Sequence, residues 1–392
     1  IMSNVRDNQD SKPAVRFKGF SDAWEKRKLG EITDSFDGKR VPIEVAMRKK
    51  GPYPYYGATG VIDHVNDYIF DGEYVLLAED GANIILRSSP IAYLTSGKFW
   101  LNNHAHIFTA KNGSNVFLLN LFEMKNYSRY NTGTAQPKLN ANVLKNIRFN
   151  VPSFQEQSAI GEFINALNST IALHQRKVEN LQKLKKSLLQ QMFVSGNDQV
   201  PKIRFKGFAD AWEQRKAKSI FKTVSEKGHP DLPVLSASQE DGMILRSKSG
   251  IDIQYKASSL SSYKLVRPNQ FVIHLRSFQG GFAYSRLTGI ASPAYTVLDF
   301  QNLRAQNPKY WIEVLRSPLF IERLKTVTYG IRDGRSISFS DFGTLKFRFP
   351  IISEQQKIAG FFAKLDLTIA LHQRKVENLQ KLKKSLLRLM FI

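Results

Sequence analysis

The sequence contains no cysteine among its 392 residues. Disulfide bonds, thiolate nucleophiles and thiolate metal ligands are therefore excluded together. Long apolar runs are missing as well: no stretch approaches the roughly 18 consecutive apolar residues that cross a bilayer, and the N-terminal stretch has no apolar signal core. We therefore expect a chain that neither enters a membrane nor is exported, and that works in the cytoplasm.

Recognisable catalytic motifs are also missing. The sequence has no G-x-x-x-x-G-K-[ST] phosphate loop, no G-x-G-x-x-G dinucleotide fingerprint and no H-E-x-x-H zinc pair. The seven histidines are scattered, and the stretch NPKYW at 307–311 lacks the second proline of the N-P-P-Y motif of adenine methyltransferases. These absences predict a non-catalytic chain that holds no cofactor and no metal of its own.

Acidic residues are scarce relative to basic ones. The chain has 34 Asp and Glu against 57 Lys and Arg, which gives a formal net charge of +23. A surplus of this size exceeds what solubility needs and favours a polyanionic partner. Nucleic acid is our first interpretation and an anionic membrane surface is a weaker one. An unusually basic but otherwise ordinary surface is the plain alternative.

What the sequence does contain is a long internal repeat. PAVRFKGFSDAWEKRKLGEI at 13–32 corresponds to PKIRFKGFADAWEQRKAKSI at 201–220, and TIALHQRKVENLQKLKKSLL occurs unchanged at 170–189 and 368–387. Between these segments the two halves differ, and β-branched and aromatic runs broken by Gly, Asn and Asp are typical of strands and turns. The repeat predicts two units, each a mixed α/β globular domain followed by a long helix. The predicted boundaries are 13–152 for the first domain, 153–200 for the first helix and linker, 201–350 for the second domain and 351–392 for the second helix.

The repeated helix carries one apolar stripe at the spacing of a paired-helix seam, with His174 and His372 in it. Ser153 with Glu156, and Ser353 with Gln356, predict capping boxes at the two helix starts. Because a compact domain returns the chain close to where the preceding helix ended, we expect the helices to pack antiparallel, with 13–32 beside the end of the second helix. The predicted fold is α+β, in a pseudo-two-fold, nearly circular arrangement. The apolar residues expected on the helices, for packing or for docking a partner, are Leu173, Val178, Leu181, Leu188, Leu371, Val376, Leu379 and Leu386.

Helix length links this architecture to DNA. A helix from Ser153 to Phe193 is roughly 60 Å long at about 1.5 Å per residue, and one turn of B-DNA is about 34 Å. Two domains on such a rod would meet one face of a duplex about a turn or a little more apart. Because the domains differ in sequence, we expect an asymmetric, two-part, gapped site.

Several stretches carry the resemblance to one protein family. They are the two RFKGF…DAWE openings, YPYYGATGVIDHVNDYIFDGEYVLLAEDGANI at 53–84, GTAQPKLNANVLKNIRFNVPSFQEQ at 133–157 and the paired LHQRKVENLQKLKKSLL helices. With them the whole chain resembles a specificity subunit of a type I DNA restriction-modification system. The resemblance implies two target-recognition domains, separated by two helices that act as a spacer and dock other subunits.

The resemblance also implies partners and a division of labour. Two modification subunits would bind S-adenosylmethionine and methylate adenine in double-stranded DNA. Up to two restriction subunits would use ATP and Mg²⁺ to translocate and cut. The chain itself would recognise the DNA sequence and perform no chemistry.

Candidate DNA contacts follow from the chemistry of base and phosphate recognition, which uses Lys, Arg, Asn, Gln, Ser and Thr side chains. The polar, glycine-containing loop YNTGTAQPKLN at 130–140 is the strongest candidate in the first domain, and YGIRDGRSIS at 329–338 is its counterpart in the second. For each residue an ordinary exposed side chain is the alternative interpretation. The predicted contacts are Lys39, Arg40, Lys49, Thr134, Gln136, Lys138, Arg276, Gln279, Arg332, Arg335 and Ser336.

Two other functional classes stay open at this point. One is a coiled-coil scaffold that holds partner proteins and does not select DNA sequences. The other is a stand-alone regulator that binds a gapped DNA site. Leu173, Leu189, Leu371 and Leu387 lie off the main stripe and indicate additional protein docking, which a solitary regulator would not need.

Overall fold

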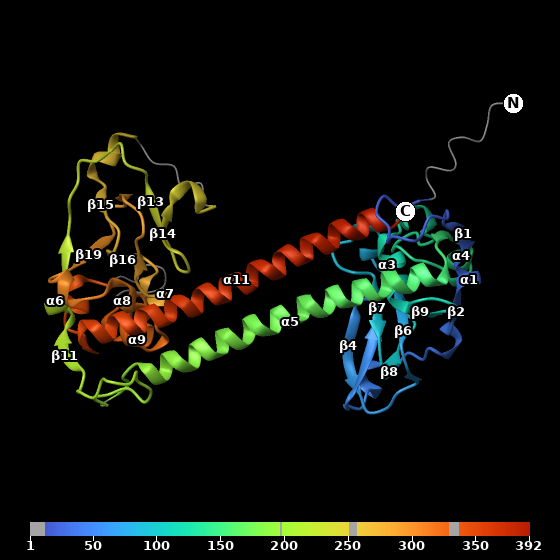
Figure 1. Ribbon diagram of the computed structural model, residues 1–392, viewed down its shortest axis with the longest axis horizontal. Coiled ribbons are helices and arrows are strands. Elements are labelled where there is room, and N and C mark those ends of the chain that lie inside the picture. Colours follow the sequence, from blue (N-terminus) through green and yellow to red (C-terminus); the bar gives the residue numbers. More distant parts are fainter. Residues whose placement is uncertain (1–11, 197, 251–256, 329–336) are drawn as a thin grey trace. The chain divides into compact units, whose positions relative to one another are not determined.

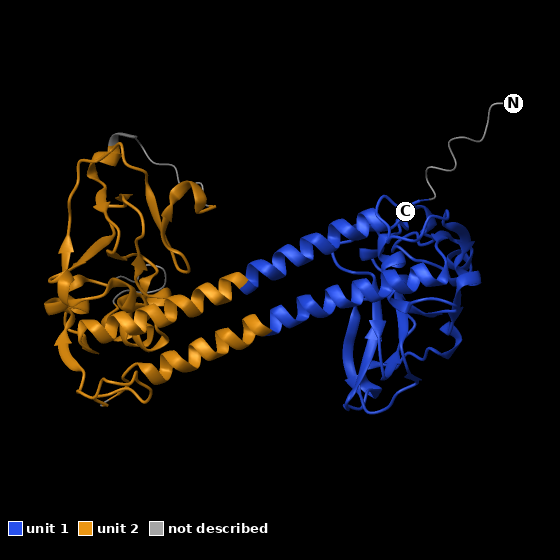
Figure 2. Cartoon of the chain, in the orientation of Figure 1, with its two compact units in different colours: residues 1–176, 372–392 blue, residues 177–371 orange. Residues whose placement is uncertain are grey.

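The computed structural model describes residues 12–196, 198–250, 257–328 and 337–392. The chain divides into two compact units: unit 1 comprises residues 1–176 and 372–392, and unit 2 comprises residues 177–371 (Figure 2). Each unit therefore holds one globular domain and part of both long helices, α5 (Phe154–Met192) and α11 (Ile352–Met390).

The strands of both units are short, and Figure 1 labels most of them. In unit 1 they are β1 (Glu25–Lys28), β2 (Thr33–Ser35), β3 (Tyr53–Gly57), β4 (Gly60–Val65), β5 (Phe70–Asp71), β6 (Tyr74–Ala78), β7 (Ala92–Thr95), β8 (Lys98–Leu101), β9 (Ala105–Ala110) and β10 (Arg148–Val151). In unit 2 they are β11 (Glu213–Lys216), β12 (Phe221–Val224), β13 (Leu235–Ser238), β14 (Gly242–Leu245), β15 (Lys264–Val266), β16 (Phe271–Ile273), β17 (Ala283–Tyr284), β18 (Gly289–Ala291), β19 (Thr296–Phe300) and β20 (Lys346–Phe349).

The two units share a framework. Each contains a four-stranded antiparallel sheet, in the order β2-β9-β6-β7 in unit 1 and β12-β19-β16-β17 in unit 2. Each also has a two-stranded antiparallel ribbon, β1-β10 or β11-β20, formed by the strand that starts at the last residue of the DAWE segment and the strand before the long helix. The repeated sequence segments thus build the equivalent parts of the two domains.

The remaining strands differ between the units. Unit 1 has a second four-stranded sheet, β4-β3-β8-β5, in which β3 and β8 run parallel. Unit 2 has two separate pairs, β13-β14 and β15-β18, in its place. The structural difference falls where the two halves of the sequence cease to match, so a common framework carries two different outer parts.

Shorter helices complete the two units. They are α1 (Leu29–Ile32), α2 (Asn83–Leu86), α3 (Asn115–Met124) and α4 (Ala141–Asn146) in unit 1, and α6 (Ala217–Ile220), α7 (Ser277–Gly280), α8 (Pro308–Leu315), α9 (Pro318–Leu324) and α10 (Phe339–Phe342) in unit 2. Helix α3 packs on β6, β7 and β9. Its N-cap residue is Ser114, whose hydroxyl accepts a hydrogen bond from the Phe117 amide.

The capping-box prediction is correct in part. At the start of α5 the Ser153 hydroxyl accepts a hydrogen bond from the Glu156 amide at 3.4 Å, but the Glu156 carboxylate pairs with Arg16 instead of capping the helix. The predicted box of Ser353 and Gln356 is wrong. Helix α11 begins at Ile352, so Ser353 lies inside it and cannot be the residue before the first turn.

The end of each long helix is anchored by the repeated DAWE segment. In unit 1 Trp24 is buried and packs edge-on against Phe391, which follows α11. In unit 2 Trp212 packs in the same way against Phe193, which follows α5. A backbone hydrogen bond of 3.0 Å from Val15 to Leu389 confirms that the segment 13–32 lies beside the end of the second helix.

The two long helices pack antiparallel within each unit. In unit 1 Ile160 near the start of α5 shares a core with Leu386 near the end of α11, and the Nδ1 atoms of His174 and His372 lie 2.9 Å apart. In unit 2 Met192 shares a core with Phe362. The predicted antiparallel seam is therefore present, and its two histidines form a hydrogen bond.

Candidate nucleic-acid interface

Two of the predicted DNA contacts in unit 1 meet at one carboxylate. Glu79 follows strand β6, and its carboxylate lies 2.6 Å from Nη1 of Arg40 and 3.3 Å from Nζ of Lys138. Arg40 and Lys138 are far apart in the sequence. Glu79 therefore joins the start of the loop at 40–50 to the loop at 131–138.

A buried histidine completes this charged cluster. The Nδ1 atom of His106 lies 2.7 Å from the Asp37 carboxylate, and its Nε2 atom lies 2.7 Å from the Leu139 carbonyl oxygen. Both ring nitrogens thus lie within hydrogen-bond distance of an oxygen atom. The cluster thus brings His106 and Arg40 together with the carboxylates of Asp37 and Glu79.

The carboxylates of this cluster are held in their charged form. Burial acts to raise the pKa of Asp37 and of Glu79. Hydrogen bonds and charges from His106 and Arg40 outweigh burial, so the pKa of both groups lies below its ordinary value. Asp37 and Glu79 are therefore charged at neutral pH, and their ion pairs and hydrogen bonds hold the loops around them.

The loop at 131–138 is tied into one conformation. The Asn131 side-chain oxygen accepts hydrogen bonds from the amides of Gly133 and Lys138, both at 2.9 Å. A Cβ atom at Gly133 would lie 1.8 Å from the Gln136 carbonyl oxygen, so this turn requires glycine. The Gly81 amide donates to the Pro137 carbonyl at 3.0 Å and fastens the loop to the end of strand β6. Thr134 and Gln136 are exposed at the tip.

The other predicted residues of unit 1 differ in how freely they could reach DNA. The Arg40 side chain is only 12 % exposed and also donates to the carbonyl oxygens of Asp37 and Ala105, so it braces the cluster. Lys39 and Lys49 are exposed. Lys138 keeps 45 % of its side chain exposed beside Glu79. The accessible polar face thus consists of Lys39, Thr134, Gln136 and Lys138, with Lys49 further along the chain.

In unit 2 the predicted residues Arg276 and Gln279 occupy the loop that leads into and forms α7. Both are exposed, while Ser277 between them is fully buried and its hydroxyl accepts a hydrogen bond from the His274 amide at 2.8 Å. Burial, with Arg276 nearby, lowers the pKa of His274 to about 4. Its neutral Nδ1 can therefore accept the Arg276 amide at 3.3 Å and shape the loop. The predicted contacts Arg332, Arg335 and Ser336 lie outside the described residues.

The long helices offer some of their predicted apolar residues to solvent. Leu173 and Leu371, which occupy equivalent positions in the repeat, are 65 % and 57 % exposed. Val178 and Val376 are buried in the seam, and Leu181, Leu188, Leu379 and Leu386 are half-buried. The valines therefore hold the helices together, whereas the two exposed leucines are available to a partner.

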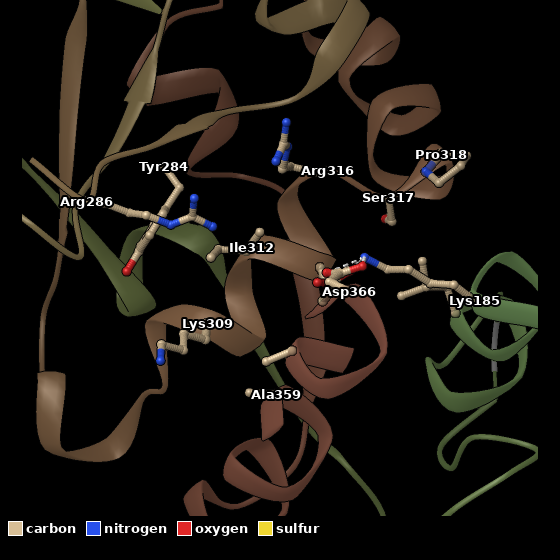
Figure 3. Close-up of a pocket in the computed structure, with 13 residues that line it drawn as sticks. Lys185, Tyr284, Arg286, Lys309, Ile312, Arg316, Ser317, Pro318, Ala359 and Asp366 are labelled. Carbon is tan, nitrogen blue, oxygen red and sulfur yellow. Dashed lines mark hydrogen bonds and ion pairs between the residues drawn. The ribbon is translucent and has the colours of Figure 1, made fainter. Parts of the chain in front are cut away.

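Lys185 of α5 is paired with two carboxylates. Its Nζ atom lies 2.8 Å from Asp366 of α11 and 3.3 Å from Glu313 of α8, at the edge of a cavity of about 600 Å³ in unit 2 (Figure 3). Burial raises the pKa of Glu313 despite the neighbouring ammonium. The lysine thereby links both long helices to the domain that they carry.

Among the described residues, no three His, Cys, Asp or Glu side chains gather as metal ligands would. None of the helices in the described ranges is both long and apolar enough to cross a membrane.

Comparison with known proteins assigns the chain to a family. The family described as "Type I restriction modification DNA specificity domain" matches residues 21–183 and again residues 199–381. A Haemophilus influenzae protein described as a type I restriction enzyme specificity subunit is 33% identical over 142 residues, which are 36% of this chain and 36% of that protein. The MjaVIII specificity subunit of Methanocaldococcus jannaschii is 23% identical over 228 residues, 52% of this chain and 50% of that subunit. These alignments thus span half or less of the relatives' own length.

A solved structure has a similar fold. The S subunit of a type I restriction-modification system from M. genitalium superimposes with a TM-score of 0.63 at 14% sequence identity. The match covers 97% of this chain and 99% of that one. At this identity the likeness concerns the fold.

Proposed function

Because the chain belongs to the type I restriction modification DNA specificity domain family, we propose that it is the sequence-reading subunit of a type I restriction-modification complex. The observation that carries the proposal is that the family matches twice, once over each half, on a framework repeated in both units. The exposed polar loops around Glu79 in unit 1, and around Ser277 in unit 2, supply side chains suited to base edges and phosphates.

We propose that each unit reads its own half of an asymmetric, gapped site in double-stranded DNA. The support is the contrast between the shared sheets and ribbons and the dissimilar outer parts, β4-β3-β8-β5 in unit 1 and β13-β14 with β15-β18 in unit 2. Equivalent frameworks with different outer parts are suited to two different sequences. The pseudo-two-fold, nearly circular arrangement of the repeats belongs to this proposal.

The proposed partners are two modification subunits and up to two restriction subunits. Leu173 and Leu371 support this because an identical exposed leucine at equivalent positions suits two copies of one partner. In this proposal S-adenosylmethionine, ATP and Mg²⁺ belong to those partners, and the chain is their non-catalytic guide on DNA in the cytoplasm.

The test is single-molecule methylome sequencing of cells that express the chain with the methyltransferase subunit encoded beside it, against cells that lack the chain. We expect a two-part adenine-methylation motif that appears only when the chain is present. An unchanged methylome, although the two proteins purify together, would favour the coiled-coil scaffold. Site-selective DNA binding by the chain alone, without methylation, would favour the stand-alone regulator.

A further inference from the structure

The loop at 40–50 of unit 1 ends in an exposed apolar tip. Val45 and Met47 lie in a short 3-10 turn (Val45–Met47) and are 76 % and 71 % exposed. Two apolar side chains exposed this far within three residues leave hydrocarbon in water, which the fold itself does not require. The tip is therefore a candidate contact surface for a binding partner.

The tip is held in place by contacts between the loop and side chains of the second sheet. The Arg48 guanidinium lies 3.3 Å from the Asp63 carboxylate and 4.4 Å from the centre of the Tyr55 ring, and its Nε donates to the Ile43 carbonyl at 3.0 Å. The hydroxyl of Tyr55, a buried residue, accepts a hydrogen bond from the Ile43 amide at 2.9 Å.

Both arms of the loop are fastened as well. The Val41 amide donates to the Leu101 carbonyl at 3.3 Å, and the Asn66 amide donates to the Lys49 carbonyl at 2.9 Å. Gly51 follows, and a Cβ atom there would lie 2.2 Å from Cα of Asn66, so the chain passes too close for any other residue. A loop braced at both arms presents its tip in a fixed place, as recognition requires.

The side chains around the tip are suited to DNA as its partner. The loop leaves the charged cluster at Arg40, and exposed Lys49 and Lys50 follow the tip directly. Exposed Glu44 precedes it. A carboxylate is disfavoured in the narrow, strongly negative minor groove, whereas in the major groove it can accept from cytosine while apolar groups contact the thymine methyl group.

We propose that Val45 and Met47 contact the methyl group of a thymine in the major groove of the half-site read by unit 1. This inference rests on the proposed function and adds a sequence-determining contact to it. The exposed lysines on the same loop hold the phosphates on either side, and the bracing by Arg48 and Tyr55 keeps the tip in register with the base edge.

The test uses the chain in complex with its methyltransferase subunit and a duplex carrying the methylated motif. The double substitution Val45→Thr/Met47→Gln makes the tip polar at nearly unchanged volume. Val15→Thr, an exposed valine of the same unit on the framework segment, is the matched control. Each protein is measured on the natural duplex and on duplexes in which single thymines of the unit 1 half-site are replaced by uracil, which lacks only the methyl group.

We expect the double variant to bind the natural duplex about tenfold more weakly, the size of losing one or two buried methyl contacts, and the Val15→Thr control to bind as the parent does. The parent should lose a similar factor at one thymine-to-uracil position, and the variant should lose nothing further there. A unit 1 half-site without thymine, or losses from variant and uracil that multiply independently, would overturn the inference. If the complex still selects the half-site of unit 2, the proposed function holds whether or not the thymine contact is found. A parent complex that selects no DNA sequence would contradict the proposed function itself.

Discussion

Arg16 and Glu156 form a two-pronged ion pair, in which Nε and Nη2 of the arginine donate to the two carboxylate oxygens at 2.7 and 2.6 Å. Arg204 and Glu354 repeat it in unit 2, at 2.7 and 2.8 Å. Each pair joins the RFKGF segment that opens a unit to the first turn of the long helix that leaves it. The repeated opening is thus a clamp on the start of one long helix, beside the tryptophan that anchors the end of the other.

Substituting Arg16 should weaken unit 1 strongly. Glu156 is 1 % exposed, so Arg16→Ala leaves an uncompensated buried carboxylate, and we expect a loss of about 3 to 5 kcal/mol in the free energy of unfolding. Arg27→Ala, which removes an exposed pair with Glu31, is the control and should change the stability far less. Urea unfolding measures both, and equal effects of the two substitutions would refute the role of the clamp.

The charged cluster at Glu79 should make unit 1 sensitive to acid. The folded-state pKa values of Asp37 and Glu79 lie below the ordinary values of 3.8 and 4.5, so their contribution to stability is fully present above those values. It is lost as the pH falls through the lower, folded-state pKa values. We expect Glu79→Gln to cost about 2 to 3 kcal/mol at neutral pH and to flatten the decline of stability below pH 4.5. An unchanged pH profile of unfolding would contradict this.

Lys138 and Gln136 should affect DNA binding in different ways. Lys138→Ala removes a point charge, so we expect weaker binding to every sequence and a slope of log affinity against log salt reduced by about 1. Gln136→Ala removes a side chain able to pair with adenine, so we expect a loss of about 1 to 3 kcal/mol at one base position. Lys145→Ala, an exposed lysine of α4, is the control. Fluorescence anisotropy on a panel of single-base variants of the duplex separates these outcomes. An equal loss of affinity on all sequences for Gln136→Ala would contradict its assignment as a base contact.

The histidine pair in the helix seam should behave as a coupled unit. With Nδ1 atoms 2.9 Å apart, one histidine donates and the other accepts. His174→Leu alone leaves His372 without that partner, and we expect a cost of about 1 kcal/mol. The double substitution His174→Leu/His372→Leu should recover most of it, because two leucines suit an apolar seam. Additive losses in this double-mutant cycle would show that the hydrogen bond contributes little.

The sequence repeats predicted the long helices and the duplicated framework because these depend on residues close together in the sequence. The long helix was expected from Ser153 to Phe193 and is found from Phe154 to Met192, since its apolar stripe and the preceding proline are both local signals. The antiparallel seam followed from chain connectivity. The duplicated framework followed from the matching segments at 13–32 and 201–220.

Pairing between distant side chains could not be predicted in this way. Arg40 has the charge of a DNA contact, but its partner Glu79 lies 39 residues away and the sequence does not show that they meet. Glu156 has the spacing of a capping-box acid, whereas its partner Arg16 lies 140 residues upstream. Val45 and Met47 resemble core residues, and only the structure shows that they are exposed. Aligning the two helix starts would have revealed one signal, because Glu156 and Glu354 are equivalent in the repeat.

The most direct test of the central claim, that each unit reads its own half-site, is to exchange residues 33–146 for the matching domain of a relative and to sequence the methylome. The exchanged segment runs from β2 to the end of α4, so the β1-β10 ribbon, the Arg16–Glu156 clamp and both long helices are retained. We expect one half of the methylated motif to change while the other half stays the same. A change in both halves, or in neither, would contradict this claim.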